Sequence, residues 1–186
     1  AGSGNDFFKV LNMPLILDKV ITMILRGRTK VIDTGKINGR YFVNGVGIGF
    51  DAAVGERARD IQWIRAGRAV YLAALLKTLG TYDALPMKIT MNGRTIEQPV
   101  FLLSIGNGTT CGGGFRLTPH AKLDDGLLDV TFVKPISVPR LLWHLPKVFQ
   151  GTLDRVVRYA SMTKVKKLRV ESTLPVPVHV DGEVYS

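Results

Sequence analysis

Residues 30–48, KVIDTGKINGRYFVNGVGI, carry the strongest indication of fold class in this chain. Residues 30–37 alternate in polarity towards Asn38-Gly39, and residues 40–48 lead away from that turn. Asn-Gly readily supplies the two positive-φ residues that a tight hairpin turn requires. The stretch therefore predicts an antiparallel β-hairpin.

The same pattern continues along the chain. A second hairpin is predicted from residues 87–91 through the turn Asn92-Gly93 to residues 94–97. Five more short runs of apolar and β-branched residues, bounded by glycine, proline or charged residues, are typical of strands. These runs are 99–105, 127–133, 156–160, 165–171 and 176–181.

Helical periodicity occurs in three regions. A first helix begins near Asn5 or Asp6, is interrupted by Pro14 and continues through residues 15–24. Other helices are predicted over residues 52–79, with a break near Gly67, and over 137–150. Strands and helices do not alternate regularly, so a doubly wound parallel sheet is not expected. We predict a mostly β fold with helical insertions, an antiparallel sandwich or barrel-like body, divided into a helical segment 1–25 and a β-rich domain 26–186.

Composition limits the class of protein. Hydrophobic residues make up 46% and charged residues 22% of the 186, which excludes a wholly disordered chain. The longest apolar run, Ala69–Leu76, is far shorter than the roughly 20 residues of a membrane-spanning helix. A single cysteine, Cys111, excludes an internal disulfide and a multi-cysteine zinc site. A cytoplasmic location is therefore expected.

The net charge of +10 favours a polyanionic partner. Basic residues gather in 57–68 and in 164–169, yet neither group alternates with aromatic residues, and no zinc-finger or RNA-recognition signature is present. We therefore expect no nucleic-acid partner. A solvated basic face and a surface facing an anionic membrane remain equally open.

Five short motifs follow one another in a fixed order. They are GSGNDF (2–7), NGVGIGFD (44–51), GNGTTCGGG (106–114, with Pro119 beyond), KLDDGLLDV (122–130) and DGE (181–183). Each motif alone is weak, but the ordered set resembles the diacylglycerol kinase-like lipid kinases, which include bacterial diacylglycerol kinases and sphingosine kinase relatives. The resemblance extends from Gly2 to Glu183.

This resemblance implies an antiparallel β-sandwich that is the second domain of a two-domain lipid kinase. The family's first domain carries a Gly-Gly-Asp-Gly-Thr loop around the ATP phosphates, and this sequence contains no such loop. We therefore expect the chain to be a fragment that is inactive by itself. The implied co-substrate is ATP, and the implied metal ion is Mg²⁺.

The last motif supplies the expected catalytic residues. By resemblance, Glu183 is the general base that accepts the proton of the lipid hydroxyl, and Asp181 orients it. Alternation of valines at 176, 178 and 180 places Glu183 just beyond the end of a strand. The alternative is an ordinary polar hairpin turn, because Asp-Gly is common in turns.

The acidic motif is the expected metal site. By resemblance, a structural Mg²⁺ is bound by the carboxylate of Asp125 and the carbonyl oxygens of Lys122 and Leu127, with Asp124 outside the coordination sphere. Oxygen ligands of this kind suit magnesium. Here too a plain turn is the alternative.

The first motif is the expected nucleotide contact. By resemblance, Ser3 contacts the nucleotide while Asn5 and Asp6 shape the cleft between the two domains; alternatively, residues 1–4 are a cloning linker. The glycine-rich stretch 106–114 either lines the substrate cleft or is an ordinary tight loop. No chemical role is assigned to Cys111 or to the three histidines, His120, His144 and His179.

Together these features predict an ATP-dependent lipid kinase that converts diacylglycerol to phosphatidate. A sphingoid-base kinase, a soluble NAD kinase and a non-catalytic lipid- or anion-binding module are the alternatives. The lipid is expected at an anionic membrane surface, reached peripherally with the help of apolar side chains in residues 61–79. Exposed hairpin edges could support a homodimer, which nothing in the sequence specifies.

Overall fold

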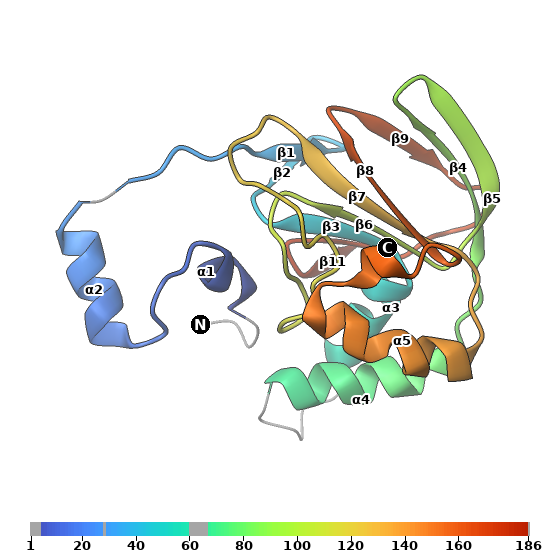
Figure 1. Ribbon diagram of the computed structural model, residues 1–186, viewed down its shortest axis with the longest axis horizontal. Coiled ribbons are helices and arrows are strands. Elements are labelled where there is room, and N and C mark those ends of the chain that lie inside the picture. The colour runs from blue at the N-terminus through green and yellow to red at the C-terminus, as the bar shows by residue number, and fades with distance from the viewer. Residues whose placement is uncertain (1–4, 28, 60–66, 186) are drawn as a thin grey trace.

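The computed structural model describes residues 5–27, 29–59 and 67–185, and the predictions for Ser3 and for residues 60–66 lie outside these ranges. Figure 1 shows a β-rich body with helices along one side and a helical segment at the N-terminus. The helices are α1 (Asp6–Val10), α2 (Leu17–Leu25), α3 (Phe50–Arg59), α4 (Gly67–Leu79), α5 (Val138–Gln150) and the short 3-10 helix η1 (Leu153–Arg155).

All strand pairs among the described residues are antiparallel. The main sheet has six strands in the order β11-β10-β3-β6-β7-β8, the second has the order β5-β4-β9, and β1 pairs with β2 alone. The mostly β, antiparallel fold class with helical insertions is thus confirmed. The strands are β1 (Gly35–Ile37), β2 (Arg40–Phe42), β3 (Gly45–Gly49), β4 (Leu85–Met91), β5 (Arg94–Val100), β6 (Leu102–Gly106), β7 (Leu128–Val133), β8 (Ala160–Val165), β9 (Leu168–Glu171), β10 (Val178–Val180) and β11 (Glu183–Tyr185).

The central strands of the main sheet, β3 and β6, are buried on both faces. Alternate residues of this sheet, such as Ile48, Leu103 and Val130, pack with Met87 and Ile89 of the second sheet. The opposite face of the main sheet packs against the helices in a second apolar cluster. This cluster includes Phe50, Val54, Leu75, Phe101, Leu102 and Phe115. Because side chains of a strand point alternately to its two faces, one sheet can hold both cores together.

Both predicted Asn-Gly turns are confirmed. Asn38 and Gly39 have φ values of 46° and 87°, and Asn92 and Gly93 have 49° and 72°, as a two-residue hairpin turn requires. The prediction of one continuous strand over residues 40–48 is wrong, however. The chain leaves β2 at Phe42, bends, and enters the main sheet as β3, so the two halves lie in different sheets.

Three other strand predictions are wrong in detail. The run 99–105 is divided between the end of β5 in the second sheet and β6 in the main sheet. Residues 157–159 form a turn after η1, and Val156 is buried among the helices; the strand begins only at Ala160. The run 165–171 is divided between β8 of the main sheet and β9 of the second sheet. In each case the apolar run contains buried residues, but it does not reveal which sheet or layer buries them.

The segment 1–25 contains α1 and α2, of which α2 lies apart from the β-rich body (Figure 1). The predicted long helix over 52–79 corresponds to α3 and α4, which are separate helices. None of the described helices is both long and apolar enough to cross a membrane.

Candidate active site

A cleft of about 600 Å³ brings together segments that are far apart in the sequence. It is lined by Asn5 and Asp6 of the first motif, by the bend before β3, by the glycine-rich stretch and by residues 181–183 of the last motif. Four of the five motifs therefore meet at one place. The fourth in order, residues 122–130, does not line this cleft.

Asp181 lies between β10 and β11 with a left-handed backbone, φ 49°. Its carboxylate accepts three backbone N–H groups at the bend: Val43 N at 2.8 Å, Asn44 N at 2.9 Å and Gly45 N at 2.8 Å. These hydrogen bonds explain why the chain bends between β2 and β3, because an ionised acceptor binds such amides strongly. Asp181 thus fixes the turn that carries Glu183.

Glu183 is the first residue of β11, and its exposed side chain lines the cleft. The hydroxyl of Tyr185 donates a hydrogen bond to its Oε2 at 2.7 Å, and this bond is the main reason why the pKa of Tyr185 is raised. One carboxylate oxygen therefore has a fixed partner. The other remains for a proton-donating ligand.

Asp6 connects α1 to the glycine-rich stretch. Its Oδ2 accepts the backbone N–H of Gly113 at 2.6 Å, and its Oδ1 pairs with Lys9 at 3.0 Å. Asn5 precedes it with φ 49° and also lines the cleft. The structure thus brings Asn5 and Asp6 to the cleft that contains Glu183, whereas Ser3 lies outside the described residues.

A buried ion pair that no sequence motif predicted adjoins this cleft, which is lined by one of its two members, His179. His179 Nε2 and Asp51 Oδ2 are 2.8 Å apart, and the two residues are only 8% and 4% exposed. A Cβ on Gly47 would clash with both side chains, so the glycine at this place in the second motif makes room for the pair. Because the two partners are 128 residues apart in the sequence, no local pattern could predict their pairing.

Opposing effects act on the pKa of His179. Burial lowers it, but the charge and hydrogen bond of Asp51, together with the charge of Asp181, raise it more, and the pKa lies above its ordinary value of 6.5. The charged imidazolium therefore stabilises the folded chain. This contribution is complete below the pKa of the unfolded chain and is lost as the pH rises through the folded-state pKa.

We therefore expect His179→Gln to destabilise the chain more at acidic than at alkaline pH. Melting temperatures of the wild type and the variant, measured between about pH 5 and pH 9, give the difference directly. It should be largest at the acidic end, where the wild-type imidazole is charged. A difference that is constant over this range would contradict the charged pair.

Three polar atoms at the cleft are buried without a hydrogen-bond partner among the described residues: Asn44 Oδ1, Thr110 Oγ1 and His179 Nδ1. Buried polar groups are almost always paired with protein, water or ligand. A polar ligand or ordered water in this cleft would satisfy them. Cys111 also lines the cleft, but burial and the nearby Asp51 and Asp6 carboxylates raise its pKa well above the ordinary value, so it is a poor nucleophile.

The expected metal ligand Asp125 already has a cationic partner. Lys164 Nζ lies 2.7 Å from Asp125 Oδ2 and 2.9 Å from Asp129 Oδ2, and it also reaches the carbonyl oxygen of His120 at 3.4 Å. The hydrogen bond from Lys164 is the largest cause of the lowered pKa of Asp125. The other oxygen, Oδ1, accepts the backbone N–H of Leu127 at 3.2 Å.

Both oxygens of Asp125 are therefore engaged, and an ammonium group lies beside the carboxylate that was expected to bind Mg²⁺. Among the described residues, no three His, Cys, Asp or Glu side chains gather so that they could hold a metal ion. Two further contacts hold the same loop in place. Lys30 forms an ion pair with Asp124, and the Asp33 carboxylate accepts the backbone N–H of Gly126.

Replacing the ammonium group should make this loop dependent on a metal ion. We expect Lys164→Met to lower the melting temperature by a few degrees, because the carboxylates of Asp125 and Asp129 then repel each other. Excess Mg²⁺ should restore part of the loss and should leave the wild type unchanged. Lys30→Met, which breaks an exposed pair at the same loop, is the control. Equal stabilisation of the wild type and Lys164→Met by Mg²⁺ would show that the ion binds with Lys164 present.

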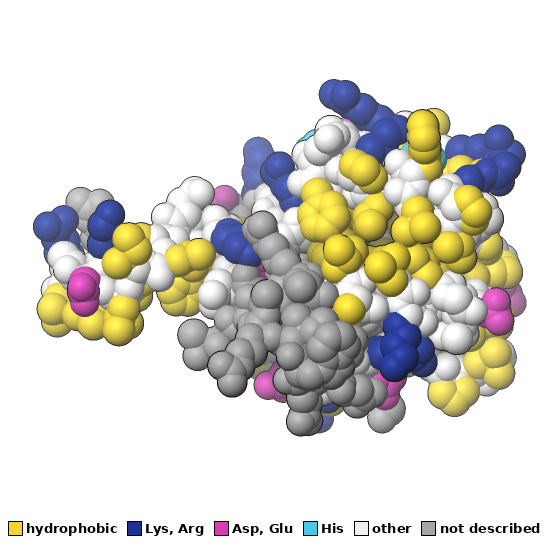
Figure 2. Space-filling model, turned by 90° about the horizontal axis from the view of Figure 1, so that it is seen from below, with side chains coloured by type: hydrophobic (Ala, Val, Ile, Leu, Met, Phe, Trp, Pro, Cys, Tyr) yellow, Lys and Arg dark blue, Asp and Glu magenta, His cyan; other side chains and the backbone are white. Residues whose placement is uncertain are grey.

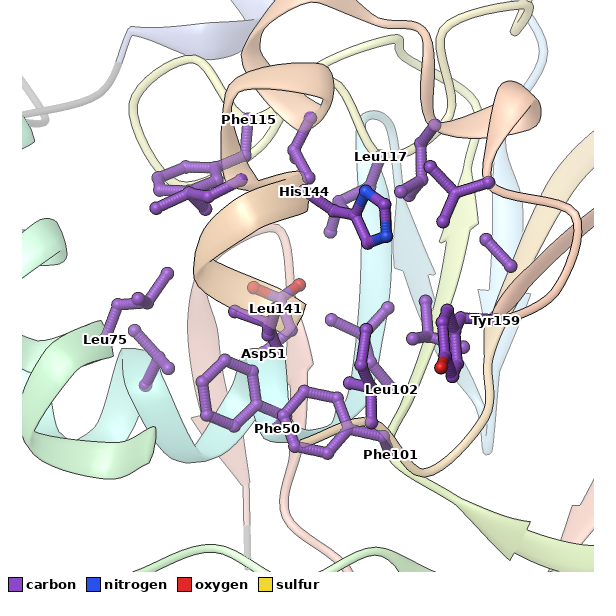
Figure 3. A pocket seen from close by; sticks show the side chains of 18 residues that line it. Phe50, Asp51, Leu75, Phe101, Leu102, Phe115, Leu117, Leu141, His144 and Tyr159 are labelled. Carbon is purple, nitrogen blue, oxygen red and sulfur yellow. The ribbon is translucent and has the colours of Figure 1, made fainter. Parts of the chain in front are cut away.

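An apolar cavity of about 80 Å³ lies beside Asp51 (Figure 3). Asp51 lines this cavity, whereas its partner His179 lines the cleft. In Figure 3, aromatic and aliphatic side chains from several elements surround the cavity, among them Leu75 of α4 and Leu141 of α5. A polar cleft and an apolar cavity therefore meet at Asp51 and His179.

Known proteins resemble this chain over most of its length. The profile described as the YegS C-terminal NAD kinase beta sandwich-like domain matches residues 44–186. A diacylglycerol kinase of Mycobacterium tuberculosis is 33% identical over 193 residues, covering 98% of this chain and 60% of its own length. A probable lipid kinase YegS-like of Shewanella frigidimarina is 27% identical, with coverages of 99% and 59%.

A solved structure shows the same fold. The crystal structure of a putative diacylglycerol kinase from Bacillus anthracis superposes with a TM-score of 0.77 at 28% identity, covering 98% of this chain and 59% of that one. The chain thus spans about 60% of the length of the relatives it matches. With a family profile that covers residues 44–186, this chain belongs to the lipid kinase-related YegS C-terminal domain family.

Proposed function

We propose that this chain forms the acceptor side of an ATP-dependent lipid kinase that phosphorylates the hydroxyl of diacylglycerol. The observation that carries the proposal is the junction of the two cavities. The cleft contains a carboxylate placed for proton transfer, and the apolar cavity begins on the other side of the Asp51–His179 pair. A lipid alcohol needs both a polar and an apolar site.

Glu183 is the general base in this proposal. It accepts the proton of the lipid hydroxyl while the hydroxyl oxygen attacks the γ-phosphorus of ATP and the bond to the β-phosphate oxygen breaks. Tyr185 holds Oε2, so that Oε1 can face the hydroxyl. Asp181 keeps the turn in place through the backbone of the β2–β3 bend.

The nucleotide is expected at the side of the cleft formed by Asn5 and Asp6, with Ser3 as a further contact. The Mg²⁺ that the reaction requires is then the ion that accompanies ATP and neutralises its phosphates. The Asp125 loop takes no part in this step. The relatives' names, diacylglycerol kinase and probable lipid kinase, support phosphoryl transfer to a lipid.

The apolar cavity supports a lipid rather than a soluble acceptor. At about 80 Å³ it is smaller than the roughly 150 Å³ cavity that can hold benzene, so an acyl chain requires the helices around it to move. All residues of α5 are described, and none is fully buried, so this helix is held only by half-buried contacts. Movement of α5 would enlarge the site.

The test is an acceptor assay with the full-length protein, in which this chain is joined to its nucleotide-binding domain. Labelled ATP is offered with dioleoylglycerol, with sphingosine and with NAD, and product formation is measured for each. The proposal expects phosphatidate as the main product. Preferential labelling of sphingosine or NAD would assign the chain to another kinase, and no turnover with any acceptor would favour a non-catalytic binding module.

A further inference from the structure

The outer faces of α4 and α5 form an unusual surface for a water-facing part of a protein. Both helices line the apolar cavity with their inner faces, through Leu75 and Leu141, and so cover the same side of the body (Figure 1). Neither Gly67–Leu79 nor Val138–Gln150 contains an acidic residue. We call the exposed side of α4, α5 and the turn after η1 the helical face.

Large apolar side chains are exposed on the helical face. Trp143 of α5 is 79% exposed and Val157 of the following turn is 80% exposed, and smaller exposed fractions are found for Leu72, Leu76, Leu142 and Phe149. Figure 2 shows hydrophobic side chains gathered over this side of the body, with Lys and Arg side chains at the margin. An exposed apolar patch rimmed by polar residues marks an interaction site.

The charge beside this patch is positive. Arg140 of α5 and Arg158 of the turn lie over the same ring, that of Tyr159, with guanidinium carbons 5.9 Å and 5.7 Å from its centroid. Lys134, Lys147 and Arg155 belong to the same stretch of chain, whose only acidic residue, Asp154, lies 3.6 Å from His120. A cationic cluster therefore adjoins the exposed tryptophan.

These features favour an anionic bilayer as the binding partner of the helical face. Tryptophan prefers the boundary between headgroups and acyl chains, and arginine beside it can bind lipid phosphates. Basic residues near an anionic leaflet are attracted electrostatically, whereas a neutral protein partner would leave them without opposite charge. The apolar cavity lies directly beneath α5, so a lipid could enter it from such a bilayer.

We propose that the helical face is the membrane-docking surface of this protein, with Trp143 and Val157 inserted among the lipids and Arg140 and Arg158 bound to anionic headgroups. The inference deepens the proposed lipid-kinase function and depends on it for its biological purpose. It assigns docking to α5 and the turn after η1 as well as to α4, the described part of the region 61–79 that was expected to face the membrane.

Tryptophan fluorescence tests this surface in the 186-residue chain. Trp63→Phe leaves Trp143 as the only tryptophan, and vesicles of phosphatidylcholine with or without phosphatidylglycerol are added. Anionic vesicles should shift the emission of Trp143 to shorter wavelength and protect it from iodide, whereas neutral vesicles should not. Added salt should weaken the effect.

A pair of double variants tests the arginines. Arg140→Gln with Arg158→Gln should weaken binding to anionic vesicles by about 30-fold, the loss expected for two basic residues at a membrane surface. Arg94→Gln with Lys167→Gln removes the same charge from exposed positions on β5 and after β8, and it should change binding little. Circular dichroism verifies that both variants are folded.

Each other outcome overturns the proposal. Vesicle binding that leaves Trp143 accessible to iodide would place the docking surface elsewhere. Equal losses of vesicle affinity in the two double variants would show that binding depends only on the net charge of the chain. Protection of Trp143 without vesicles, rising with protein concentration, would make the helical face a contact between copies of the chain. Because the assay measures binding alone, a full-length protein that binds vesicles through Trp143 but lacks turnover would refute the proposed function and leave the surface intact.

Discussion

Glu183→Gln is expected to lower the turnover of the full-length kinase by about 10²–10⁴-fold, the usual contribution of a general base. Glutamine has nearly the same volume and can still accept the hydrogen bond of Tyr185, but it cannot take up the proton of the lipid hydroxyl. The affinity for ATP should change little, because Glu183 acts on the acceptor. Steady-state kinetics with diacylglycerol and ATP varied in turn give both quantities.

The matched control is Glu171→Gln. Glu171 is also an exposed strand residue, on β9, and its carboxylate pairs only with the exposed Arg169 at 2.8 Å among the described contacts. Turnover of this variant should equal that of the wild type. Near-normal turnover of a folded Glu183→Gln enzyme would remove Glu183 as the base and would leave residues 181–183 as a structural turn.

Asp181→Asn should have the largest effect on stability. The carboxylate accepts three backbone N–H groups with its two oxygens, whereas the amide nitrogen of asparagine would face one of those donors. Asparagine tolerates the left-handed backbone, so the loss is confined to these hydrogen bonds. We expect a loss of about 2 kcal/mol, which lowers the melting temperature by about 4–8 °C in a chain of this size.

Denaturant unfolding and thermal melting of this chain measure that loss. Asp124→Asn is the control, because Asp124 forms an exposed pair with Lys30 at 3.0 Å, and such pairs contribute little. In the full-length enzyme Asp181→Asn should also reduce turnover, though less than Glu183→Gln, if it acts by positioning. Unchanged stability together with a full loss of turnover would instead make Asp181 a residue that touches the reacting groups.

Local chemistry explains which parts of the fold were predictable. The turns at Asn38-Gly39 and Asn92-Gly93 depend only on two adjacent residues and a left-handed backbone, and both predictions are confirmed. The helix over 138–150 was likewise marked by a proline in its first turn and by Gly151, which has φ 71° at the C-cap. Such signals act within a few residues.

The wrong predictions came from burial that a local pattern cannot distinguish. Within residues 156–160, Val156, Tyr159 and Ala160 pack with the helices while Val157 is 80% exposed, and a strand would show the same short apolar run. The bend that divides residues 40–48 between two sheets depends on Asp181, which is 138 residues from Val43. No periodicity within the stretch could reveal that partner.

By itself, the sequence determined the antiparallel β-rich class, the turns and the residue types of five motifs, because these follow from backbone preferences and local spacing. Only the tertiary structure decided which side chains meet. It pairs Asp51 with His179 between a polar cleft and an apolar cavity, and it places the Lys164 ammonium at the Asp125 carboxylate, where a metal ion was expected. Such pairs form between residues distant in the chain, so no local pattern reveals them, and for Asp51 and His179 burial strengthens the electrostatic attraction.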